Sequence, residues 1–512
     1  MHPSVHARTQ PDRAAIIMAG SGETITFAEL DRRSNQVAQL LRSRGIGIGD
    51  TVALCMENHP WFFCLTWGFQ RAGLHYVGIS SRLTPPEIAY ILEDSGAKIL
   101  FSSAYLAATM DEVAKLAPQV PQLRFGVDAQ AALAAMPDSP IADERAGVDM
   151  LYSSGTTGRP KGVKIPLPED PAIDQANALV GLTMMAFGIK PDAVYLSPAP
   201  LYHAAPLRWS MTIQKLGGTV VVMEKFDPEA ALAAIEKYRI TDAQFVPTHF
   251  VRMLKLPEEV RRKHDVSTLK CAIHAAAPCP VPVKQAMIEW WGPVLYEYYA
   301  GTEGNGFTFV TSQEWLTKPG TVGRALTGII RVCDEAGDEL PRGSEGQIFF
   351  EPTEGMVSFE YHNDPQKTLD AKNKHGWTSL GDVGYQDEDG YLFLTDRKSF
   401  MIISGGVNIY PQEIENLLIT HPKVADAAVI GAPDPDMGER VVAVVQPMDM
   451  GEESPELAEE LMAYLAPQLS RVKMPRQIDF REQLPRELTG KLYKRLLRDE
   501  YKEAYEKAQT AN

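Results

Sequence analysis

The sequence predicts an α/β protein with a large N-terminal domain of layered α/β subdomains and a β-rich part, followed by a small α+β C-terminal domain. Three observations support this class. The 512 residues are too many for one hydrophobic core. Strand-like apolar runs alternate with helical segments before residue 300, which is typical of parallel strands joined by helices. Beyond residue 320 short strands and polar turns take over, and a compact α+β pattern begins near residue 396.

The first elements have recognisable start signals. Residues 26–44 predict an amphipathic helix, because Thr26 and Glu29 have capping-box spacing and Leu30 and Val37 recur on one face. A strand, an apolar helix after a proline, a second helix and a short strand follow over residues 51–58, 61–71, 84–96 and 98–101.

The alternation continues through the middle of the chain. We expect strands over residues 194–198, 217–223, 241–247 and 269–278, and helices over residues 228–240 and 282–292. This order favours parallel strands covered by helices.

The last third changes character. Polar turns predict hairpins around residues 334–339 and 381–396. Pro411 then opens a helix without loss of a hydrogen bond. We place the domain boundary near 395–400, which divides the chain into an N-terminal domain of residues 1–395 and a C-terminal domain of residues 396–512.

Composition and charge exclude several classes of protein. With 45% hydrophobic and 23% charged residues the chain is neither disordered nor collagen-like. The formal net charge of −16 argues against general binding of nucleic acid, whose phosphates it repels. A ligand that carries phosphates therefore requires a local positive pocket or a metal ion.

The cysteines and apolar segments indicate a cytoplasmic protein. The five cysteines are odd in number and never spaced as C-x-x-C, so neither a disulfide framework nor a zinc site is predicted. The N-terminus lacks the apolar core of a signal peptide. The most apolar stretch, residues 61–69, is far shorter than the roughly 20 residues of a membrane span. A homodimer is the default expectation for a soluble oligomer.

The densest motif lies at residues 152–162, with the sequence YSSGTTGRPKG. Its glycines free the backbone to curl, and its hydroxyl groups and N–H groups can wrap phosphate oxygens while Lys161 adds a positive charge. It is not a Walker A loop, because Pro160 stands at the place of the second glycine. Alone, this run is also compatible with a surface turn.

Three further motifs carry polar groups suited to a nucleotide. YYAGTEG at residues 298–304 combines a tyrosine that can stack on a base with a carboxylate that can hold Mg²⁺. Asp382 and Arg397 bracket the second hairpin and can bind hydroxyl groups. LPRELTGK at residues 484–491 presents Lys491 after a glycine. Each of these, taken alone, can also be a turn or a surface charge.

Together the four motifs resemble the adenylate-forming superfamily, which contains acyl- and aryl-CoA synthetases, luciferases and the adenylation domains of peptide synthetases. They stand in the family's order with similar spacing, and the resemblance covers nearly the whole chain. It implies an enzyme that uses ATP and Mg²⁺ to make an acyl-adenylate, and a C-terminal domain that is a mobile lid.

The resemblance assigns nucleotide roles residue by residue. The phosphate loop comprises Ser153, Ser154, Gly155, Thr156, Thr157, Gly158 and Lys161. Tyr299 stacks on adenine beside Ala276, Ala277 and Pro278, Thr302 contacts the α-phosphate, and Glu303 binds Mg²⁺. Asp382 and Arg397 anchor the ribose.

The resemblance also assigns catalytic and conformational roles. Lys491, His203 and Thr302 are the expected catalytic residues, Lys491 being the lysine of the adenylation step. Ser399 falls at the hinge, where aspartate or lysine is more usual. Gly405 and Gly406 match the strand along which the pantetheine arm of CoA slides, since a bare backbone leaves room for it.

The expected function is an ATP-dependent carboxylate–CoA ligase that forms an acyl-AMP and then the thioester, with release of pyrophosphate and AMP. CoA is the leading acceptor, because the sequence ends soon after Lys491 and His203-Ala204 lacks the aspartate that holds an amino group in amino-acid-activating relatives. Transfer to a separate carrier protein, a hydroxycinnamate-specific ligase and a nucleotide sensor without turnover remain alternatives.

By analogy the acyl pocket is walled by residues 245–250 and by Tyr202, His203, Ala300, Gly301, Gly306 and Phe307. The small residues among these are expected to leave space for a bulky or extended tail. No Lys or Arg stands in these stretches, which favours a hydrophobic monocarboxylate. Fatty, arylpropenoic and alicyclic acids remain open. His249 is either a contact for a substrate hydroxyl or a hydrogen-bonded helix residue.

The local exception to the negative charge lies at residues 471–498, which hold nine basic and three acidic residues. We expect this segment, with Lys161, Arg397 and Mg²⁺, to attract ATP and the phosphates of CoA.

Overall fold

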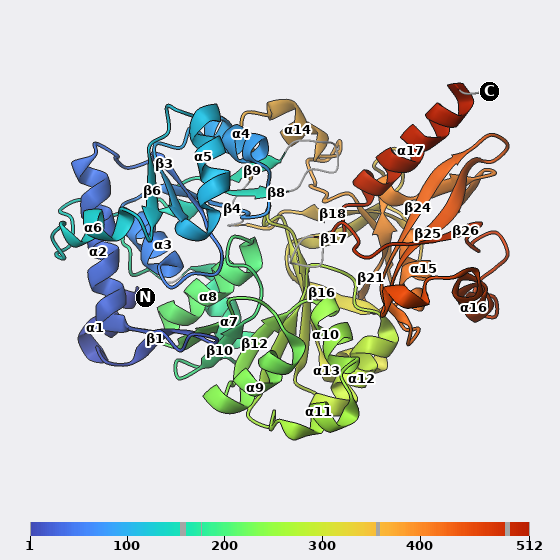
Figure 1. Cartoon of the computed structure of the whole chain (residues 1–512), viewed down its shortest axis with the longest axis horizontal. Helices are drawn as coiled ribbons and strands as arrows, with labels where there is room; N and C mark the ends of the chain where they lie inside the picture. Colours follow the sequence, from blue (N-terminus) through green and yellow to red (C-terminus); the bar gives the residue numbers. More distant parts are fainter. Residues whose placement is uncertain (1, 154–159, 176, 355–358, 487–491, 511–512) are drawn as a thin grey trace.

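The structure is a computed structural model that describes residues 2–153, 160–175, 177–354, 359–486 and 492–510. Its strands form four sheets, and helices separate and cover the two large ones (Figure 1). The predicted α/β class is confirmed. Within the described residues, no helix combines the length and the apolar character that crossing a membrane requires.

The N-terminal sheet has five parallel strands in the order β6-β5-β3-β4-β7. They span Gln122–Phe125, Leu100–Ser103, Thr51–Cys55, His75–Ile79 and Val148–Asp149. The helices of this region are α1 (Pro3–Thr9), α2 (Phe27–Ser43), α3 (Phe62–Arg71), α4 (Pro85–Ser95), α5 (Ala107–Leu116) and α6 (Ala129–Ala134).

The largest sheet has thirteen strands, in the order β17-β18-β20-β21-β16-β15-β14-β13-β12-β10-β11-β1-β2. Its parallel centre runs from β1 (Ala14–Met18) through β11 (Thr219–Val222), β10 (Val194–Ser197), β12 (Asp242–Phe245) and β13 (Cys271–His274) to β14 (Leu295–Ala300). β2 (Thr24–Thr26) pairs with β1 in the antiparallel sense.

The other side of this sheet is antiparallel throughout. It comprises β15 (Phe307–Thr311), β16 (Thr321–Thr327), β17 (Ile329–Cys333), β18 (Gly346–Glu351), β20 (Asp382–Gln386) and β21 (Leu392–Arg397). The hairpin expected around residues 381–396 is thus β20–β21, and residues 334–339 open the longer β17–β18 connection.

Helices line both faces of the thirteen-stranded sheet. α9 (Pro228–Tyr238), α10 (Pro247–Leu254), α11 (Glu258–Lys263), α12 (Val281–Trp291) and α13 (Ser312–Thr317) belong to one side, where most of them share a core with the strands. α7 (Ala178–Met185) and α8 (Ala204–Leu216) belong to the other, where α8 shares a core with α2 and α3. α8 therefore lies in an inner layer between two sheets.

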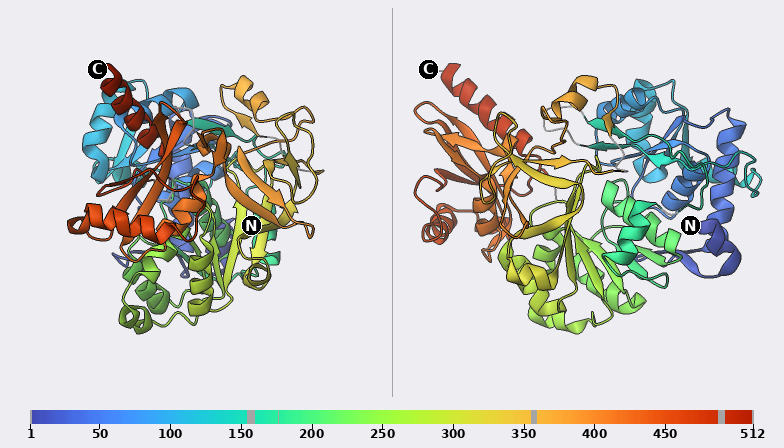
Figure 2. Two further views of the ribbon diagram at one scale, coloured as in Figure 1. Left: turned by 90° about the vertical axis from the view of Figure 1, so that its right-hand side faces the viewer. Right: turned by 180° about the vertical axis from the view of Figure 1, so that it is seen from behind.

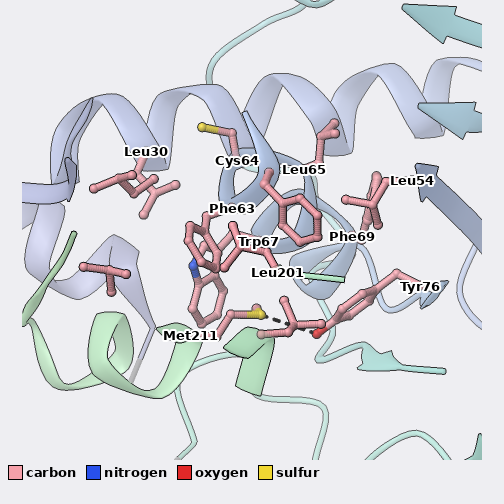
Figure 3. Packing of buried hydrophobic residues seen from close by; sticks show 14 of the residues in the cluster. Leu30, Leu54, Phe63, Cys64, Leu65, Trp67, Phe69, Tyr76, Leu201 and Met211 are labelled. Carbon is pink, nitrogen blue, oxygen red and sulfur yellow. Dashed lines mark hydrogen bonds between the residues drawn. The ribbon is translucent and has the colours of Figure 1, made fainter. Parts of the chain in front are cut away.

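The inner layer is held by the aromatic core shown in Figure 3. Trp67 of α3 is fully buried, and its indole Nε1 donates to Gln214 Oε1 of α8 over 2.6 Å. The Tyr76 hydroxyl of β4 donates to the sulfur of Met211, 3.7 Å away. These polar contacts lie within close apolar packing, so the position of α8 against the N-terminal sheet is closely fixed.

The two remaining sheets have three and five strands. β8 (Leu151–Ser153), β9 (Lys161–Lys164) and β19 (Glu360–Tyr361) form a three-stranded sheet, with α14 (Pro365–Asp370) following β19. The C-terminal part contains β22 (Ile402–Ser404), β23 (Val407–Ile409), β24 (Val424–Asp434), β25 (Gly438–Pro447) and β26 (Gln477–Phe480), covered by α15 (Pro411–Leu418), α16 (Pro455–Leu465) and α17 (Lys494–Thr510).

The C-terminal part stands beside the antiparallel side of the large sheet and away from the N-terminal sheet, as Figure 1 and the right-hand view of Figure 2 show. The boundary at residues 395–400 stays a prediction; β21 ends there and a short 3-10 helix, Lys398–Phe400, leads into β22.

The predicted start signals produce the expected helices. The Thr26 hydroxyl accepts from the N–H of Glu29 over 3.2 Å at the start of α2, and Thr84 and Glu87 form a capping box at α4. Pro411 is the first residue of α15. The short strand expected over residues 98–101 lies two residues later, at Leu100–Ser103.

Candidate active site

A cavity of about 1850 Å³ opens at the carboxyl ends of the central parallel strands. The segments after β10, β12, β13 and β14 line it, and so do β20, β21, α7, α8, α15 and the beginning of α17. A crevice outside the carboxyl ends of the strands is where open α/β sheets bind ligands. Residues of both the large sheet and the C-terminal part line the cavity.

The expected ribose anchors meet in this cavity. The Tyr299 hydroxyl donates to Asp382 Oδ2 over 2.6 Å, and Arg397 Nε donates to Asp382 Oδ1 over 3.1 Å. Asp382 and Arg397 are direct partners in the β20–β21 pairing. Burial, and after it the Asp382 charge, raises the pKa of Tyr299, which therefore stays a protonated donor.

The alanine run after β13 forms another wall. Ala275, Ala276, Ala277 and Pro278 all line the cavity. Ala276 has a φ of +76°, in the left-handed region that side chains larger than glycine rarely adopt. Such strain is typical of functional sites, and Ala276 is an exposed residue of the cavity wall.

The phosphate end combines a cation with a carboxylate. The Tyr361 hydroxyl donates to Glu303 Oε1 over 2.9 Å, and the Lys161 ammonium lies 5.1 Å from the Tyr361 ring centroid. Burial, and then the neighbouring Lys367, lowers the pKa of Lys161 to about 8. The β8–β9 pairing sets Ser153 opposite Lys161. The predicted loop residues Ser154, Gly155, Thr156, Thr157 and Gly158 lie outside the described residues.

Glu303 fits the expected Mg²⁺ site. Glu303 lines the cavity, as do Lys161 and Tyr361, and its carboxylate accepts from the Tyr361 hydroxyl. Among the described residues no group of three or more His, Cys, Asp or Glu side chains could hold a metal ion. Proteins commonly bind Mg²⁺ through one or two carboxylates together with substrate phosphates and water, and the role of Glu303 as a ligand stays a prediction.

Arg208 is a site residue that the sequence analysis missed. Its guanidinium forms an ion pair with Asp149 over 2.7 Å and donates through Nη1 to the Thr302 carbonyl over 3.4 Å. It lines the cavity from α8, five residues after His203. Arg208 lies outside the sequence motifs described above, and its partner Asp149 is remote in sequence.

The acyl end of the cavity contains the expected Tyr202, His203, Ala300, Gly301, Gly306 and Phe307. Two helices and three strands also contribute to this end, which the sequence did not indicate, and they supply the lining residues Leu179, Leu182, Met185, Ala186, Pro206, Trp209, Gln244, Tyr298 and Phe309. Only their approach in the fold brings these residues together, although the apolar α7 could have been suspected.

Two glycines of the cavity lining pack closely against side chains of the protein. A Cβ on Gly306 would lie 2.0 Å from Phe350, and one on Gly301 would lie 2.6 Å from Leu380. The lack of a side chain at each position therefore permits this close packing. The expected place of both glycines in the acyl pocket stays a prediction.

The two histidines differ in their placement. His203 is the N-cap of α8 and lines the cavity, with its ring centroid 4.5 Å from that of Tyr202. His249 is buried in α10 and stacks on Phe226 with centroids 3.8 Å apart. Burial lowers the pKa of His249 to about 3. Since His249 does not line the cavity, the reading of it as a helix residue is the one that the structure favours.

The C-terminal part contributes charged groups to the cavity wall. Lys494 forms a buried ion pair with Glu415 of α15 over 2.8 Å, and Arg486 pairs with Asp426 of β24. All four residues line the cavity. Lys491, the predicted adenylation lysine, lies outside the described residues, between Arg486 and Lys494. Arg486 and Lys494 line the same cavity as Tyr299, Asp382 and Arg397.

The remaining predicted residues lie apart from the cavity lining. Ser399 is in the 3-10 helix after β21, and its carbonyl accepts from Arg498 Nη1 over 3.0 Å. Gly405 and Gly406 form the turn between β22 and β23, with φ values of +58° and +78°. Their roles as hinge and CoA tunnel stay predictions.

The basic segment 471–498 meets acidic residues in the fold. Five of its described basic residues pair with acids outside it, through Lys473–Glu413, Arg481–Glu500, Arg486–Asp426, Lys494–Glu415 and Arg498–Glu439. These partners, which lie outside the segment in sequence, reduce the local positive charge, and the expected attraction of the segment for ATP and CoA phosphates stays a prediction.

Comparison with known proteins agrees with this geometry. The sequence model described as AMP-binding enzyme matches residues 4–356, and the AMP-binding enzyme C-terminal domain matches residues 413–491. The chain belongs to the AMP-binding enzyme family. The predicted adenylate-forming superfamily is thus confirmed, and with it an AMP-forming enzyme of the acyl-CoA synthetase type.

Relatives of this AMP-binding enzyme cover almost its whole length. It is 33% identical to the fatty acid–[acyl-carrier-protein] ligase ScoC of Streptomyces coeruleorubidus, over 97% of this chain and 95% of that protein. It is also 33% identical to the long-chain-fatty-acid–CoA ligase FadD13 of Mycobacterium tuberculosis, over 97% of each. Among solved structures, ATP-bound MatB of Rhodopseudomonas palustris superimposes with a TM-score of 0.80 at 30% identity, over 99% of this chain and 100% of that one.

Proposed function

We propose that this AMP-binding enzyme activates a hydrophobic monocarboxylic acid with ATP and transfers the acyl group to CoA. The observation that carries the proposal is one cavity in which the nucleotide anchors Tyr299, Asp382 and Arg397 are continuous with an apolar end. At that end Arg208 forms an ion pair with Asp149. A second carboxylate on the substrate would therefore have to compete with Asp149 for this cation.

The first half-reaction joins two anions, so the site must align them and neutralise charge. The acid's carboxylate oxygen attacks the α-phosphorus, a new P–O bond forms, and pyrophosphate leaves with the electrons of the broken bond. Mg²⁺ held by Glu303 would neutralise phosphate charge. Lys161 and Lys491 would hold the phosphates by their ammonium groups, while Arg208 steadies the Thr302 carbonyl.

The second half-reaction breaks the acyl–phosphate bond. The thiol of CoA loses its proton as its sulfur attacks the acyl carbon, and AMP leaves. We expect Lys491 to withdraw before a thiol arm can enter, because the ammonium that serves the first step would otherwise stay beside the acyl-adenylate. A turn of the C-terminal part near Ser399 would supply that movement.

The test is a pair of assays on the purified protein with fatty, arylpropenoic and alicyclic acids. Release of pyrophosphate that depends on the acid, together with release of AMP that depends on free CoA, is the expected result. Tight ATP binding without pyrophosphate release from any acid would contradict the proposal and favour a nucleotide sensor.

Transfer to a carrier protein is the second candidate, which the similarity to ScoC supports. Under that alternative acyl-AMP accumulates in the presence of free CoA and is consumed only when a phosphopantetheinylated carrier protein is added. The two acceptors are thus distinguished by which thiol discharges a pre-formed acyl-AMP.

A further inference from the structure

The acyl end of the cavity contains one polar shelf. Tyr298 and Tyr299 are neighbours on β14 and so point to opposite faces of the strand. Tyr299 faces Asp382, whereas the Tyr298 hydroxyl faces Trp209 of α8 and Gln244 of β12. The Tyr298 ring stacks on Phe307 with centroids 4.8 Å apart and an interplanar angle of 12°. Trp209, Gln244, Tyr298 and Phe307 all line the cavity.

Among the described residues, the hydrogen bonds at this shelf leave one donor, the Tyr298 hydroxyl, without an acceptor. Trp209 Nε1 donates to the Tyr298 oxygen over 3.3 Å, and Gln244 Nε2 donates to the same oxygen over 3.3 Å. An indole N–H is only a donor. The Gln244 amide is oriented by Tyr195, whose hydroxyl donates to Gln244 Oε1 over 3.4 Å. The Tyr298 oxygen thus receives two hydrogen bonds, and its own hydrogen is directed at neither partner.

This donor is present at neutral pH. Burial raises the pKa of Tyr298 to about 12, so the phenol stays protonated. Tyr298, Trp209 and Gln244 are each more than nine-tenths buried. A buried donor left unpaired weakens binding by about tenfold or more. A hydrocarbon tail that displaced water from the shelf would leave the Tyr298 hydroxyl unpaired. An oxygen atom on the tail would instead accept the hydroxyl hydrogen.

We propose that Tyr298 is a specificity-determining residue that selects acids whose tail carries an oxygen able to accept a hydrogen bond, such as a hydroxyl, methoxy or keto group. This inference rests on the proposed function and names the substrate class of the same cavity. The flat Phe307–Tyr298 pair also offers an aromatic tail a surface on which to stack.

The test compares acids in matched pairs that differ by one oxygen. Phenylpropanoic acid is measured against its meta- and para-hydroxy derivatives, and lauric acid against its omega-hydroxy derivative, as kcat/KM for pyrophosphate release. In the unaltered enzyme the best oxygenated acid should exceed its plain partner by about tenfold, which corresponds to one buried donor satisfied. In Tyr298→Phe, which keeps the stacked ring, that ratio should fall to about one.

A matched control lies two residues away. Tyr296→Phe removes a hydroxyl from the same strand at a residue outside the cavity lining, and it should keep the ratio of the unaltered enzyme. Equal rates within every pair in the unaltered enzyme would overturn the inference while the ligase function stands. The same ratio in Tyr298→Phe as in the unaltered enzyme would also overturn it. Absence of pyrophosphate release with every acid would overturn the proposed function, and this inference with it.

Discussion

The Tyr299 hydroxyl and Arg397 Nε donate hydrogen bonds to opposite oxygens of the Asp382 carboxylate, over 2.6 Å and 3.1 Å. Asp382 is only 7% exposed, so its orientation is fixed before any ligand arrives. A carboxylate held in this way can accept hydrogen bonds from two ribose hydroxyls without paying to reorganise.

The Asp382 contact predicts how ATP binding responds to mutation. Asp382→Asn removes the charge that pairs with Arg397 and weakens the acceptor, so the KM for ATP should rise by about tenfold or more. Tyr299→Phe keeps the ring and should weaken ATP binding less, by about 0.5–1.5 kcal/mol. Pyrophosphate exchange at varied ATP concentration measures both. A larger loss in Tyr299→Phe than in Asp382→Asn would contradict the arrangement.

Lys161 predicts a pH dependence. Burial and the nearby Lys367 hold the pKa of Lys161 at about 8 in the free enzyme. The protonated form binds phosphate, so kcat/KM for ATP should be constant below that pH and fall as pH rises through it. Lys367→Met removes a like charge, raises the pKa of Lys161 and should move the falling limb to higher pH. A limb that stays in place in Lys367→Met would contradict this account.

Gly306 predicts an effect on the nucleotide that is independent of the acid. A Cβ at this position would lie 2.0 Å from Phe350, whose ring packs against Tyr299 with centroids 6.1 Å apart. Gly306→Ala should therefore lower the melting temperature and raise the KM for ATP equally with short and long acids. Gly306→Ala combined with Phe350→Leu should recover part of the loss. A selective loss of the longest acids would instead support a place for Gly306 in the tail pocket.

The fold class and the meeting of Asp382 with Arg397 could be predicted because their signals are local. The capping spacing at Thr26 and the proline at position 411 act on the residues next to them, so these helix starts can be read from the local sequence. Asp382 and Arg397 lie on one hairpin, so short sequence separation already brings them together.

The acyl end could not be predicted in the same way. Arg208 meets Asp149, and Trp209 meets Tyr298, only after α8 is packed between two sheets. Glycine size at position 306 suggested space, whereas the direction of its missing Cβ depends on where Phe350 lies. Likewise, the charge of segment 471–498 was read without the acids that the fold sets against it.

In the proposed two-step ligase, Lys491 serves only the first step, the formation of the adenylate. Lys491→Ala should reduce adenylate formation, measured as pyrophosphate exchange, by about a hundredfold or more, since it removes a cation from the α-phosphate. The same variant should convert pre-formed acyl-AMP and CoA to thioester within about threefold of the unaltered rate, because Lys491 has left by then. Equal loss of both half-reactions would contradict the account.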